Sequence, residues 1–316
     1  MLGRWDNMKI CFMGSMDFAV EILENLHKKY GVDLVVTQPD KPVGRKQILT
    51  GTPVKNKAVE LGIDTFQPVS IKKSNQRIID KKFDFIIVAA YGQLIPESVL
   101  YSSKFQAINV HASLLPKYRG GSPMHKAIIN GDSETGVSII YMEKALDSGN
   151  ILSQASVKIE EEDNVKTIEN KLSKLGSDLL LITLEKLLKG DIKTIKQDSN
   201  LVTYAYNFKN EELVIDFSKT ARDLYNFVRG LNPWPIAYFV YENKKVKVFE
   251  VEYKDQDMSD KCGEIVIADK SGLWIQTASG IINLKRIQLE GKKEMDIQAF
   301  MNGLGKQMFH KGQILK

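Results

Sequence analysis

The stretch INVHASLLPKYRGGSPMHKAIINGDSETGVSIIYMEKALD, residues 108–147, places polar side chains where a buried strand would be apolar. Its beginning predicts a strand on which Asn109 and His111 are two positions apart and therefore point to the same face. A loop rich in proline and glycine follows, and a second predicted strand, 136–142, ends shortly before Asp147. An asparagine, a histidine and an aspartate are thus expected at strand ends, where they can address one substrate atom.

The rest of the first part of the chain alternates apolar runs with amphipathic segments. Runs of strand length occur at 10–13, 32–37, 85–90, 107–110 and 137–141. Several are apolar on both faces, which is typical of a buried parallel sheet. Apolar residues at helical spacing predict helices over 18–29, 53–61 and 165–188. This order indicates an α/β fold, a mostly parallel twisted sheet with flanking helices like a Rossmann fold.

The pattern changes after Lys189-Gly190, where the last of these helices should end. Residues 191–210 lose periodicity and are interpreted as a linker. From Tyr238 onward, short strands broken by turn residues predict a small antiparallel β-barrel, similar to an OB-fold. We therefore expect an N-terminal extension over 1–7, an α/β catalytic domain over 8–190, the linker, and a barrel domain over 211–316.

Composition narrows the setting of the protein. The 316 residues carry a net charge of +5, from 44 basic and 39 acidic residues, which is compatible with a polyanionic partner. Two scattered cysteines, Cys11 and Cys262, fit a reducing cytoplasm, and they predict neither disulfides nor a metal site. No apolar run reaches membrane-spanning length. Gly14 to Phe18 lacks the G-x-G-x-x-G spacing, so we expect neither NAD nor ATP.

Two motifs carry a family resemblance. They are Asn109-Val110-His111-x-Ser113-Leu114-Leu115-Pro116-x-Tyr118-Arg119-Gly120 and Leu146-Asp147-Ser148-Gly149, which resemble the signature of folate-dependent formyltransferases. Three further segments resemble the methionyl-tRNA formyltransferases in particular: Thr37 to Arg45, Val88 to Pro96, and Asn232 to Pro235. The last of the three also occurs in relatives that act on sugars. The likeness covers nearly the whole chain.

The resemblance implies a reaction and a catalytic trio. The formyl group of 10-formyltetrahydrofolate would pass to the amino group of methionyl initiator tRNA, through a tetrahedral centre whose oxygen is negative. Asn109 and a protonated His111 would donate hydrogen bonds to that oxygen. Asp147 would orient the imidazole and favour its charged form. His111 or Asp147, directly or through water, would accept the proton that the amine loses.

The resemblance also implies two binding regions. The folate pocket would be formed by backbone groups and apolar side chains of Ser113, Leu114, Leu115, Pro116, Tyr91, Gly92, Leu94 and Ile95. Initiator tRNA would contact a basic loop that begins at Lys41, and the tRNA-binding residues would be Arg45, Lys41, Lys46 and Lys209. Lys209 would stand in for a lysine that is often found at the position of Asn207. A solvated basic loop is the ordinary explanation for such a run.

Other interpretations of the same residues stay open. Asn109 and His111 can satisfy backbone groups at a strand end, and Asp147 can serve a turn. A formyltransferase of amino-sugar nucleotides would share the trio, but it should lack the basic loop. A tRNA-binding module with an inactive catalytic fold is a third interpretation. For the enzyme we expect a cytoplasmic protein, without a membrane partner and monomeric.

Overall fold

The structure of the protein is a computed structural model that describes residues 8–44 and 46–315. The extension expected over 1–7 lies outside the described residues. The chain forms two compact units. The first contains the chain up to Pro123, Glu134–Lys158 and Glu169–Tyr206, and the second contains Met124–Ser133, Ile159–Ile168 and the chain from Asn207 onward.

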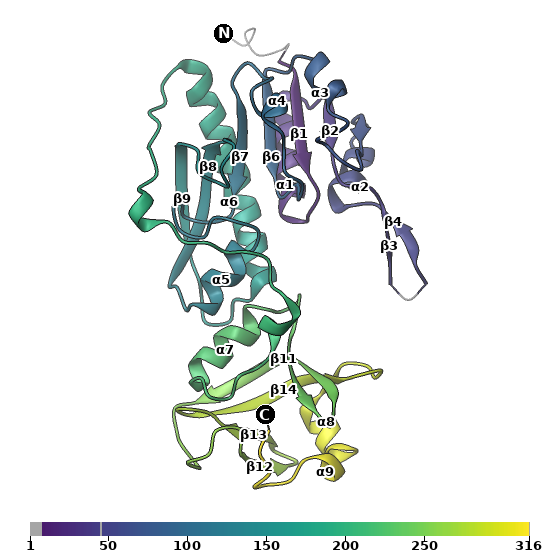
Figure 1. Ribbon diagram of the computed structural model, residues 1–316, viewed down its shortest axis with the longest axis vertical. Coiled ribbons are helices and arrows are strands. Elements are labelled where there is room, and N and C mark those ends of the chain that lie inside the picture. Colours follow the sequence, from purple (N-terminus) through teal and green to yellow (C-terminus); the bar gives the residue numbers. More distant parts are fainter. Residues whose placement is uncertain (1–7, 45, 316) are drawn as a thin grey trace. The chain divides into compact units, whose positions relative to one another are not determined.

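The first unit is built on a seven-stranded sheet with the order β5-β2-β1-β6-β7-β8-β9 (Figure 1). Its strands are β1 (Ile10–Gly14), β2 (Leu34–Val36), β5 (Thr65–Phe66), β6 (Phe85–Ala89), β7 (Ala107–His111), β8 (Glu134–Tyr141) and β9 (Ile151–Lys158). The pairings from β5 to β7 are parallel, and β8 and β9 are added in antiparallel fashion. The predicted α/β class with a mostly parallel sheet is confirmed.

Helices cover both faces of this sheet. They are α1 (Phe18–Tyr30), α2 (Pro53–Glu60), α3 (Gln76–Asp80), α4 (Glu97–Leu100) and α6 (Val165–Lys189), whereas α5 (Pro123–Ile129) lies almost entirely in the second unit. α6 lies beside α1, because Ser173 Oγ donates a hydrogen bond to the Phe18 carbonyl at 2.8 Å. At Gly176 of α6, an added Cβ would lie 3.0 Å from Val110, so the helix packs directly on β7. α3 and α4 pack on the opposite face, with Ile78 and Val99 in one core cluster with Met13.

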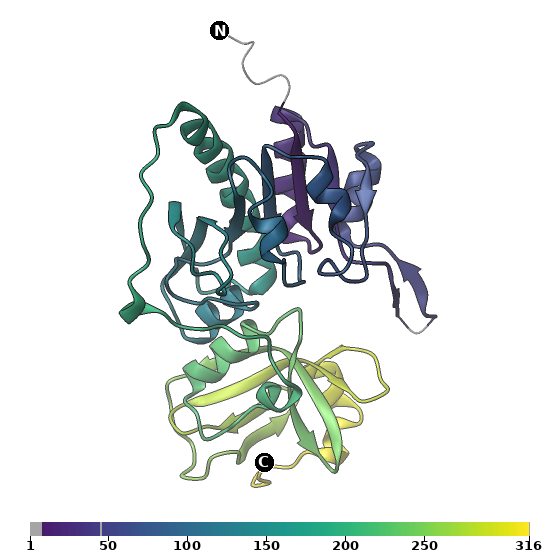
Figure 2. The same ribbon diagram turned by 45° about the horizontal axis from the view of Figure 1, so that its top comes forward.

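A two-stranded hairpin extends from the first unit. It consists of β3 (Lys41–Val43) and β4 (Ile48–Thr50), which pair Lys41 with Thr50 and Val43 with Ile48. All six strand residues are exposed, and the hairpin projects away from the sheet (Figure 2). The sequence predicted a basic loop here, and the structure forms this loop as a hairpin. The apolar side chains Val43, Ile48 and Leu49 are more than half exposed, and strands of three residues are too short for an apolar pattern to predict them.

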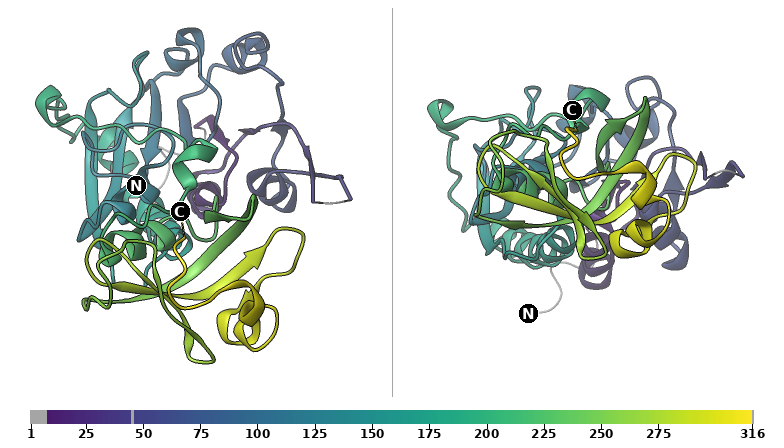
Figure 3. Two further views of the ribbon diagram at one scale, coloured as in Figure 1. Left: turned by 60° about the horizontal axis from the view of Figure 1, so that its bottom comes forward. Right: turned by 90° about the horizontal axis from the view of Figure 1, so that it is seen from below.

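The second unit contains an antiparallel sheet with the order β10-β11-β14-β13-β12, and β15 pairs with β14. The strands are β10 (Ala237–Tyr241), β11 (Lys244–Lys254), β12 (Ile265–Asp269), β13 (Gly272–Gln276), β14 (Ile281–Leu289) and β15 (Met295–Asp296). The helices are α7 (Ala221–Arg229), α8 (Ile297–Asn302) and α9 (Gly305–Met308), with short 3₁₀ turns η1 (Ser199–Leu201) in the first unit and η2 (Asn210–Leu213) in the second. Figure 3 shows the curved sheet with α8 and α9 in yellow.

The sheet of the second unit is antiparallel, as predicted, but it is not closed into a barrel. The edge of β10 is covered by Ile215, whose N–H donates to the Tyr238 carbonyl at 2.8 Å. The edge of β12 is covered by the C-terminal segment, where Gly312 donates to the Ile265 carbonyl at 2.8 Å. Because irregular segments occupy both edges, the two edge strands are not paired with each other among the described residues.

Candidate active site

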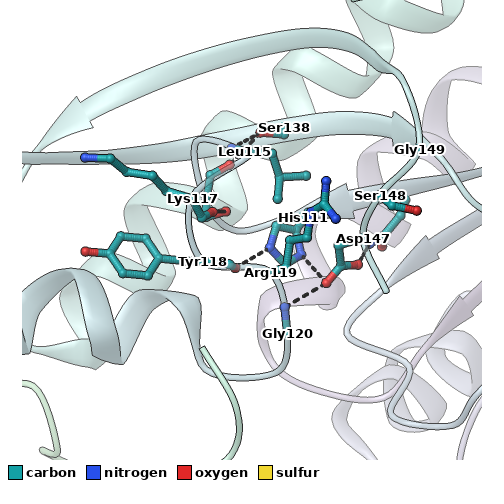
Figure 4. Close-up of polar contacts among 12 residues, drawn as sticks. His111, Leu115, Lys117, Tyr118, Arg119, Gly120, Ser138, Asp147, Ser148 and Gly149 are labelled. Atoms are coloured by element: carbon teal, nitrogen blue, oxygen red, sulfur yellow. Dashed lines mark hydrogen bonds and ion pairs between the residues drawn. The ribbon is translucent and has the colours of Figure 1, made fainter. Parts of the chain in front are cut away.

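The structure brings the side chains of Asn109, His111 and Asp147 together in the first unit. Figure 4 shows His111 and Asp147 facing each other. His111 Nδ1 lies 3.6 Å from Asp147 Oδ2, and Asn109 Nδ2 donates to Asp147 Oδ1 at 3.4 Å. Asn109 and His111 are nearly buried at the carboxyl end of β7. Asp147 comes from the connection between β8 and β9. The edge where parallel strands end is the usual place for a ligand site in an open α/β sheet.

A tight turn aims the carboxylate of Asp147. The residue has φ of 46°, in the left-handed region, which aspartate tolerates better than most residues. Its Oδ2 accepts a hydrogen bond from the Gly120 N–H at 2.8 Å. A hydrogen bond from a backbone N–H to a carboxylate is charge-assisted and strong. The carboxylate is therefore held by the loop that follows β7 as well as by its own turn.

Both ring nitrogens of His111 face acceptors. Nε2 lies 3.0 Å from the Tyr118 carbonyl, and a carbonyl only accepts hydrogen bonds, so Nε2 carries a proton. Nδ1 faces the carboxylate of Asp147. At 3.6 Å this contact is longer than a hydrogen bond, and together with the Tyr118 carbonyl it fixes the orientation of the ring.

The first predicted folate segment, Ser113 to Pro116, forms a tight loop after β7. Ser113 Oγ donates to the Lys117 carbonyl at 2.7 Å, and the Ser113 carbonyl accepts from Ser138 Oγ at 2.6 Å. Leu115 is buried, whereas Leu114 is partly exposed and in contact with Gly136, where an added Cβ would lie 2.5 Å from it. Polar residues on β8 and β9 thus fix the backbone of this loop.

The second predicted folate segment, Tyr91 to Ile95, follows β6 at the same sheet edge. The side chain of Tyr91 is buried in the core, and burial raises the pKa of its hydroxyl. Gly92 has φ of 83°, and an added Cβ would lie 2.2 Å from Gln38 Nε2, so only glycine fits. Leu94 is exposed, and Ile95 packs against the core.

A depression of about 550 Å³ adjoins this segment. It is lined by Gln38, Pro39, Lys41, Val69, Ser70, Ile71, Lys72, Gln93 and Leu94. Two residues predicted for different ligands, Leu94 for folate and Lys41 for tRNA, therefore share one depression. Its mixture of exposed apolar surface and a few polar groups is suited to an organic ligand with polar ends.

The residues predicted to contact tRNA are placed in different parts of the chain. Lys41 and Lys46 are exposed at the β3–β4 hairpin of the first unit. Lys209 is exposed in the second unit, where its backbone N–H donates to Glu212 Oε2 at 2.9 Å at the start of η2. Arg45 lies outside the described residues.

Sequence reasoning missed Gln197, which is buried beside the trio. Its Nε2 donates to the carbonyls of Asp147 and Gly149, each at 2.8 Å. Its Oε1 accepts from Arg119 Nε at 3.1 Å and Arg119 Nη2 at 2.8 Å. Gln197 lies in the segment that was interpreted as a linker, and no local pattern marks it. A network that joins residues 50 positions apart can be seen only in the folded chain.

In residues 8–44 and 46–315, no three side chains of histidine, cysteine, aspartate or glutamate are grouped as a metal site. Over the same residues, no helix has the length and apolar character needed to cross a bilayer.

Comparison with known proteins places the chain in a family. The family described as formyl transferase matches residues 8–184, and the one described as formyl transferase, C-terminal domain, matches residues 207–305. The fold is that of a formyl transferase. A methionyl-tRNA formyltransferase of Listeria monocytogenes serotype 4a (strain HCC23) is 46% identical over 303 residues, covering 95% of this chain and 97% of the relative. The chain belongs to the methionyl-tRNA formyltransferase family.

A second relative agrees with this placement, and a solved structure shares the fold. A methionyl-tRNA formyltransferase of Staphylococcus aureus (strain MW2) is 43% identical over 298 residues, covering 93% of this chain and 96% of the relative. The structure is also similar to an N-formyltransferase from Helicobacter canadensis, solved with folinic acid and dTDP-3-aminofucose. That likeness has a TM-score of 0.68 at 18% identity and covers 88% of this chain and 99% of the other. At such low identity it establishes the fold alone.

Proposed function

We propose that this chain transfers the formyl group of 10-formyltetrahydrofolate to the free amino group of methionyl initiator tRNA, and so supports translation initiation in the cytoplasm. The identity of 46% along 97% of a methionyl-tRNA formyltransferase carries this proposal. The gathering of Asn109, His111 and Asp147 at one sheet edge supports it independently. The sequence identity supports the choice of acceptor, and the three side chains support the chemistry of transfer.

The trio has the groups that acyl transfer to an amine requires. The amide of Asn109 is a hydrogen-bond donor that can stabilise an oxygen as it becomes negative, and His111 would add a second donor through Nδ1, which is not hydrogen-bonded to Asp147 at 3.6 Å. Asp147 orients the ring through its contact with Nδ1. The Tyr118 carbonyl holds the opposite side of the ring, so His111 is fixed at both nitrogens. Little reorganisation is then needed when charge develops.

The same groups manage the proton that the attacking amine loses. An α-amino group has a pKa of about 7.7, and esterification of the carboxyl group lowers it, so the amine is largely neutral near pH ~7. A strong base is therefore not required before attack. Asp147, whose Oδ2 already faces His111, is placed to accept this proton directly or through water and to pass it to the folate nitrogen as that nitrogen leaves.

The co-substrate would lie along the carboxyl ends of β6 and β7. Backbone groups of the 91–95 and 113–116 segments border this edge, and the exposed side chain of Leu94 offers apolar surface for a flat ring. The depression beside Leu94 extends the same surface toward Gln38 and Lys41. A lysine at the rim fits the carboxylates that a folate carries on its tail.

The direct test compares two acceptors. Purified protein is incubated with 10-formyltetrahydrofolate and either charged initiator tRNA or a dTDP-linked amino sugar, and formylated product is measured by mass spectrometry. We expect formylmethionyl-tRNA only. Formylation of the sugar nucleotide alone would replace the proposal with the activity suggested by the fold likeness to sugar formyltransferases. Binding of tRNA without consumption of the formyl donor would indicate an inactive binding module.

A further inference from the structure

Two tyrosine rings lie stacked and exposed in the segment that follows η1. The ring centroids of Tyr204 and Tyr206 are 5.3 Å apart, and their planes differ by 5°. The residues are 51% and 62% exposed, although large aromatic side chains are usually buried for the most part. We call these two residues the tyrosine pair. A flat apolar surface displayed to solvent in this way is suited to binding another planar group.

The backbone of the tyrosine pair is attached to the loop that follows β7. Tyr204 forms a parallel bridge with Arg119. The Arg119 N–H donates to the Thr203 carbonyl at 2.9 Å, and the Ala205 N–H donates to the Arg119 carbonyl at 2.8 Å. Gly120 makes this approach possible, because an added Cβ would lie 2.7 Å from the Ala205 carbonyl oxygen. The position of the tyrosine pair is therefore built into the fold of the first unit.

The loop to which the tyrosine pair is attached is the one that holds the catalytic trio. The residue before Arg119 is Tyr118, whose carbonyl accepts from His111. The residue after it is Gly120, whose N–H donates to Asp147. The tyrosine pair is thus joined to a backbone segment that contacts two of the three catalytic side chains. A ligand stacked on the pair would be bound next to the site of formyl transfer.

Two basic side chains accompany the pair. Lys117 and Arg119 lie on the loop to which the pair is attached, and the carboxylates nearby are Asp147, which accepts from the Gly120 N–H, and Asp198, which accepts from the Asn200 N–H. A nucleic acid brings phosphates to any place where its bases bind, and basic side chains can contact them.

The geometry points to a stacking site for an unpaired base at the 3′ end of the acceptor tRNA on Tyr204 and Tyr206. This inference rests on the proposed function and names the part of the acceptor that the pair binds. Methionine is esterified to the terminal nucleotide, so its amino group reaches Asn109 and His111 only when the unpaired end of the tRNA lies beside the 118–120 loop. Stacking on aromatic side chains is the common way to hold unpaired bases without reading their sequence.

The test uses the full-length enzyme and a double variant, Tyr204→Leu with Tyr206→Leu. We expect the KM for charged initiator tRNA to rise about 5- to 150-fold, the range that loss of one stacked base gives. The kcat value and the KM for 10-formyltetrahydrofolate should stay near those of the unaltered enzyme. The lost contact stabilises bound tRNA equally before and during formyl transfer, so its loss raises only the KM for tRNA. The matched variant with phenylalanine at both positions retains the aromatic faces and should behave like the unaltered enzyme.

A spectroscopic measurement reports stacking directly. Initiator tRNA is prepared with a fluorescent adenine analogue at its 3′ terminus, and fluorescence is followed as enzyme is added. Quenching by the unaltered enzyme and the phenylalanine variant, with none by the leucine variant at saturating protein, is the expected result. Tyr101→Leu is the control, because Tyr101 is 54% exposed in the same unit and has no role in the site described above.

The remaining outcomes overturn the inference. They are an unchanged KM for tRNA in the leucine variant, equal losses in the leucine and phenylalanine variants, or a rise in the KM for the formyl donor instead. Thermal melting of each variant identifies a loss of fold, and a leucine variant that is unstable is replaced by the two single substitutions. If the unaltered enzyme formylates no charged tRNA, the proposed function itself fails. If the enzyme is active and substitution of the tyrosine pair leaves the KM for tRNA unchanged, only the stacking site is refuted.

Discussion

Among single residues, Asp147 has the most connected position in the candidate active site. Its carboxylate accepts a hydrogen bond from the Gly120 N–H and faces His111 and Asn109. Its carbonyl accepts a hydrogen bond from Gln197 Nε2. The positive φ of Asp147 allows the side chain and the carbonyl to be held by different parts of the chain. A substitution at this residue would therefore disturb geometry and charge together, which makes its neighbours better probes of mechanism.

Asn109→Ala removes one of the two proposed donors without removing charge. We expect kcat to fall about 10²- to 10³-fold, the usual effect of losing one oxyanion donor. The KM for tRNA should change little, because the amide acts on the developing charge and not on the acceptor stem. Steady-state kinetics with charged initiator tRNA measure both values. Turnover equal to that of the unaltered enzyme would remove Asn109 from the mechanism.

Gln197→Leu tests whether the glutamine positions the Asp147 turn. Leucine has a similar size but leaves two carbonyls and the Arg119 guanidinium without this partner, at a cost of about 1–3 kcal/mol for each buried group. We expect a lower melting temperature and a reduced kcat with an unchanged KM for tRNA.

The control for this substitution is Gln106→Leu. Gln106 donates one hydrogen bond to the Met142 carbonyl at 2.7 Å in the same unit and does not contact the trio. It should lower stability while leaving kcat unaffected. Equal effects of the two substitutions on kcat would show that Gln197 contributes only to general stability.

At the scale of elements, the sequence predicted the buried strands and the long helices best. β1, β6 and β7 are fully buried and apolar, so their runs stand out from the surrounding chain. β9 was not predicted, because it is an edge strand in which half-buried and exposed residues alternate after the first two buried positions and the polar residues outnumber the apolar ones there.

The residues of the candidate site also differ in whether a local sequence pattern marks them. Asn109 and His111 are found because polar residues on one face of a buried strand are conspicuous, and the family signature adds Asp147. Gln197 and Thr203 could not be found, because they act through backbone groups of residues that are distant in sequence. Contacts of this kind leave no periodicity in the chain.

The β3–β4 hairpin carries the next prediction. Lys41→Ala combined with Lys46→Ala removes two exposed charges from this hairpin and its turn. If they contact phosphates, the KM for tRNA should rise. The slope of log KM against log salt concentration should also become smaller, by about one for each phosphate contact that is lost. The KM for the formyl donor should not change. Kinetics between low and high salt measure this.

Lys104→Ala is the control for the hairpin variant, because Lys104 is also exposed in the first unit but lies outside the predicted tRNA contacts. A hairpin variant with the same salt dependence as this control would contradict the assignment of Lys41 and Lys46. Arg45→Ala belongs to the same series. We expect it to weaken productive use of tRNA while leaving folate binding intact, and a defect confined to folate would show that the hairpin has another role.

For the whole molecule, the two units are not consecutive pieces of chain. Residues 124–133 and 159–168 leave the first unit and pack with the C-terminal part. Within the second unit, the buried Arg229 Nη1 donates to the carbonyls of Glu160, Glu161 and Asp163. Hydrogen bonds to several carbonyls are what a buried guanidinium requires. Residues 124–133 and 159–168 are therefore part of the second unit. Cutting the sequence at a single point would not separate the two units.

Global stability should depend on pH through His125. Burial lowers the pKa of His125, and the hydrogen bond between its Nε2 and the Trp234 carbonyl opposes that shift only in part. The unfolded chain has the ordinary value of about 6.5. Stability is then complete above this value and is lost as pH falls toward the lower pKa of the folded state, because the unfolded chain binds more protons.

The measurement is the melting temperature between pH ~7.5 and ~5. His125→Gln keeps a hydrogen-bond donor and removes the titration, so its melting temperature should decline less with acid than that of the unaltered protein. His310→Gln is the control, since His310 is exposed in the same unit. Parallel declines in the His125 variant and the unaltered protein would exclude His125 as the source.

The attachment of residues 195–205 to the loops of the trio has a consequence for how the enzyme is made. Asn109, His111 and Asp147 are synthesised before Gln197 and Thr203. A nascent chain that ends within α6 already contains the three side chains of the trio, but the Asp147 carbonyl lacks Gln197, and the Tyr118 N–H lacks its acceptor, Thr203 Oγ1. We therefore expect formylation to begin only after the chain has emerged past this segment, so that incomplete products of translation do not consume the formyl donor.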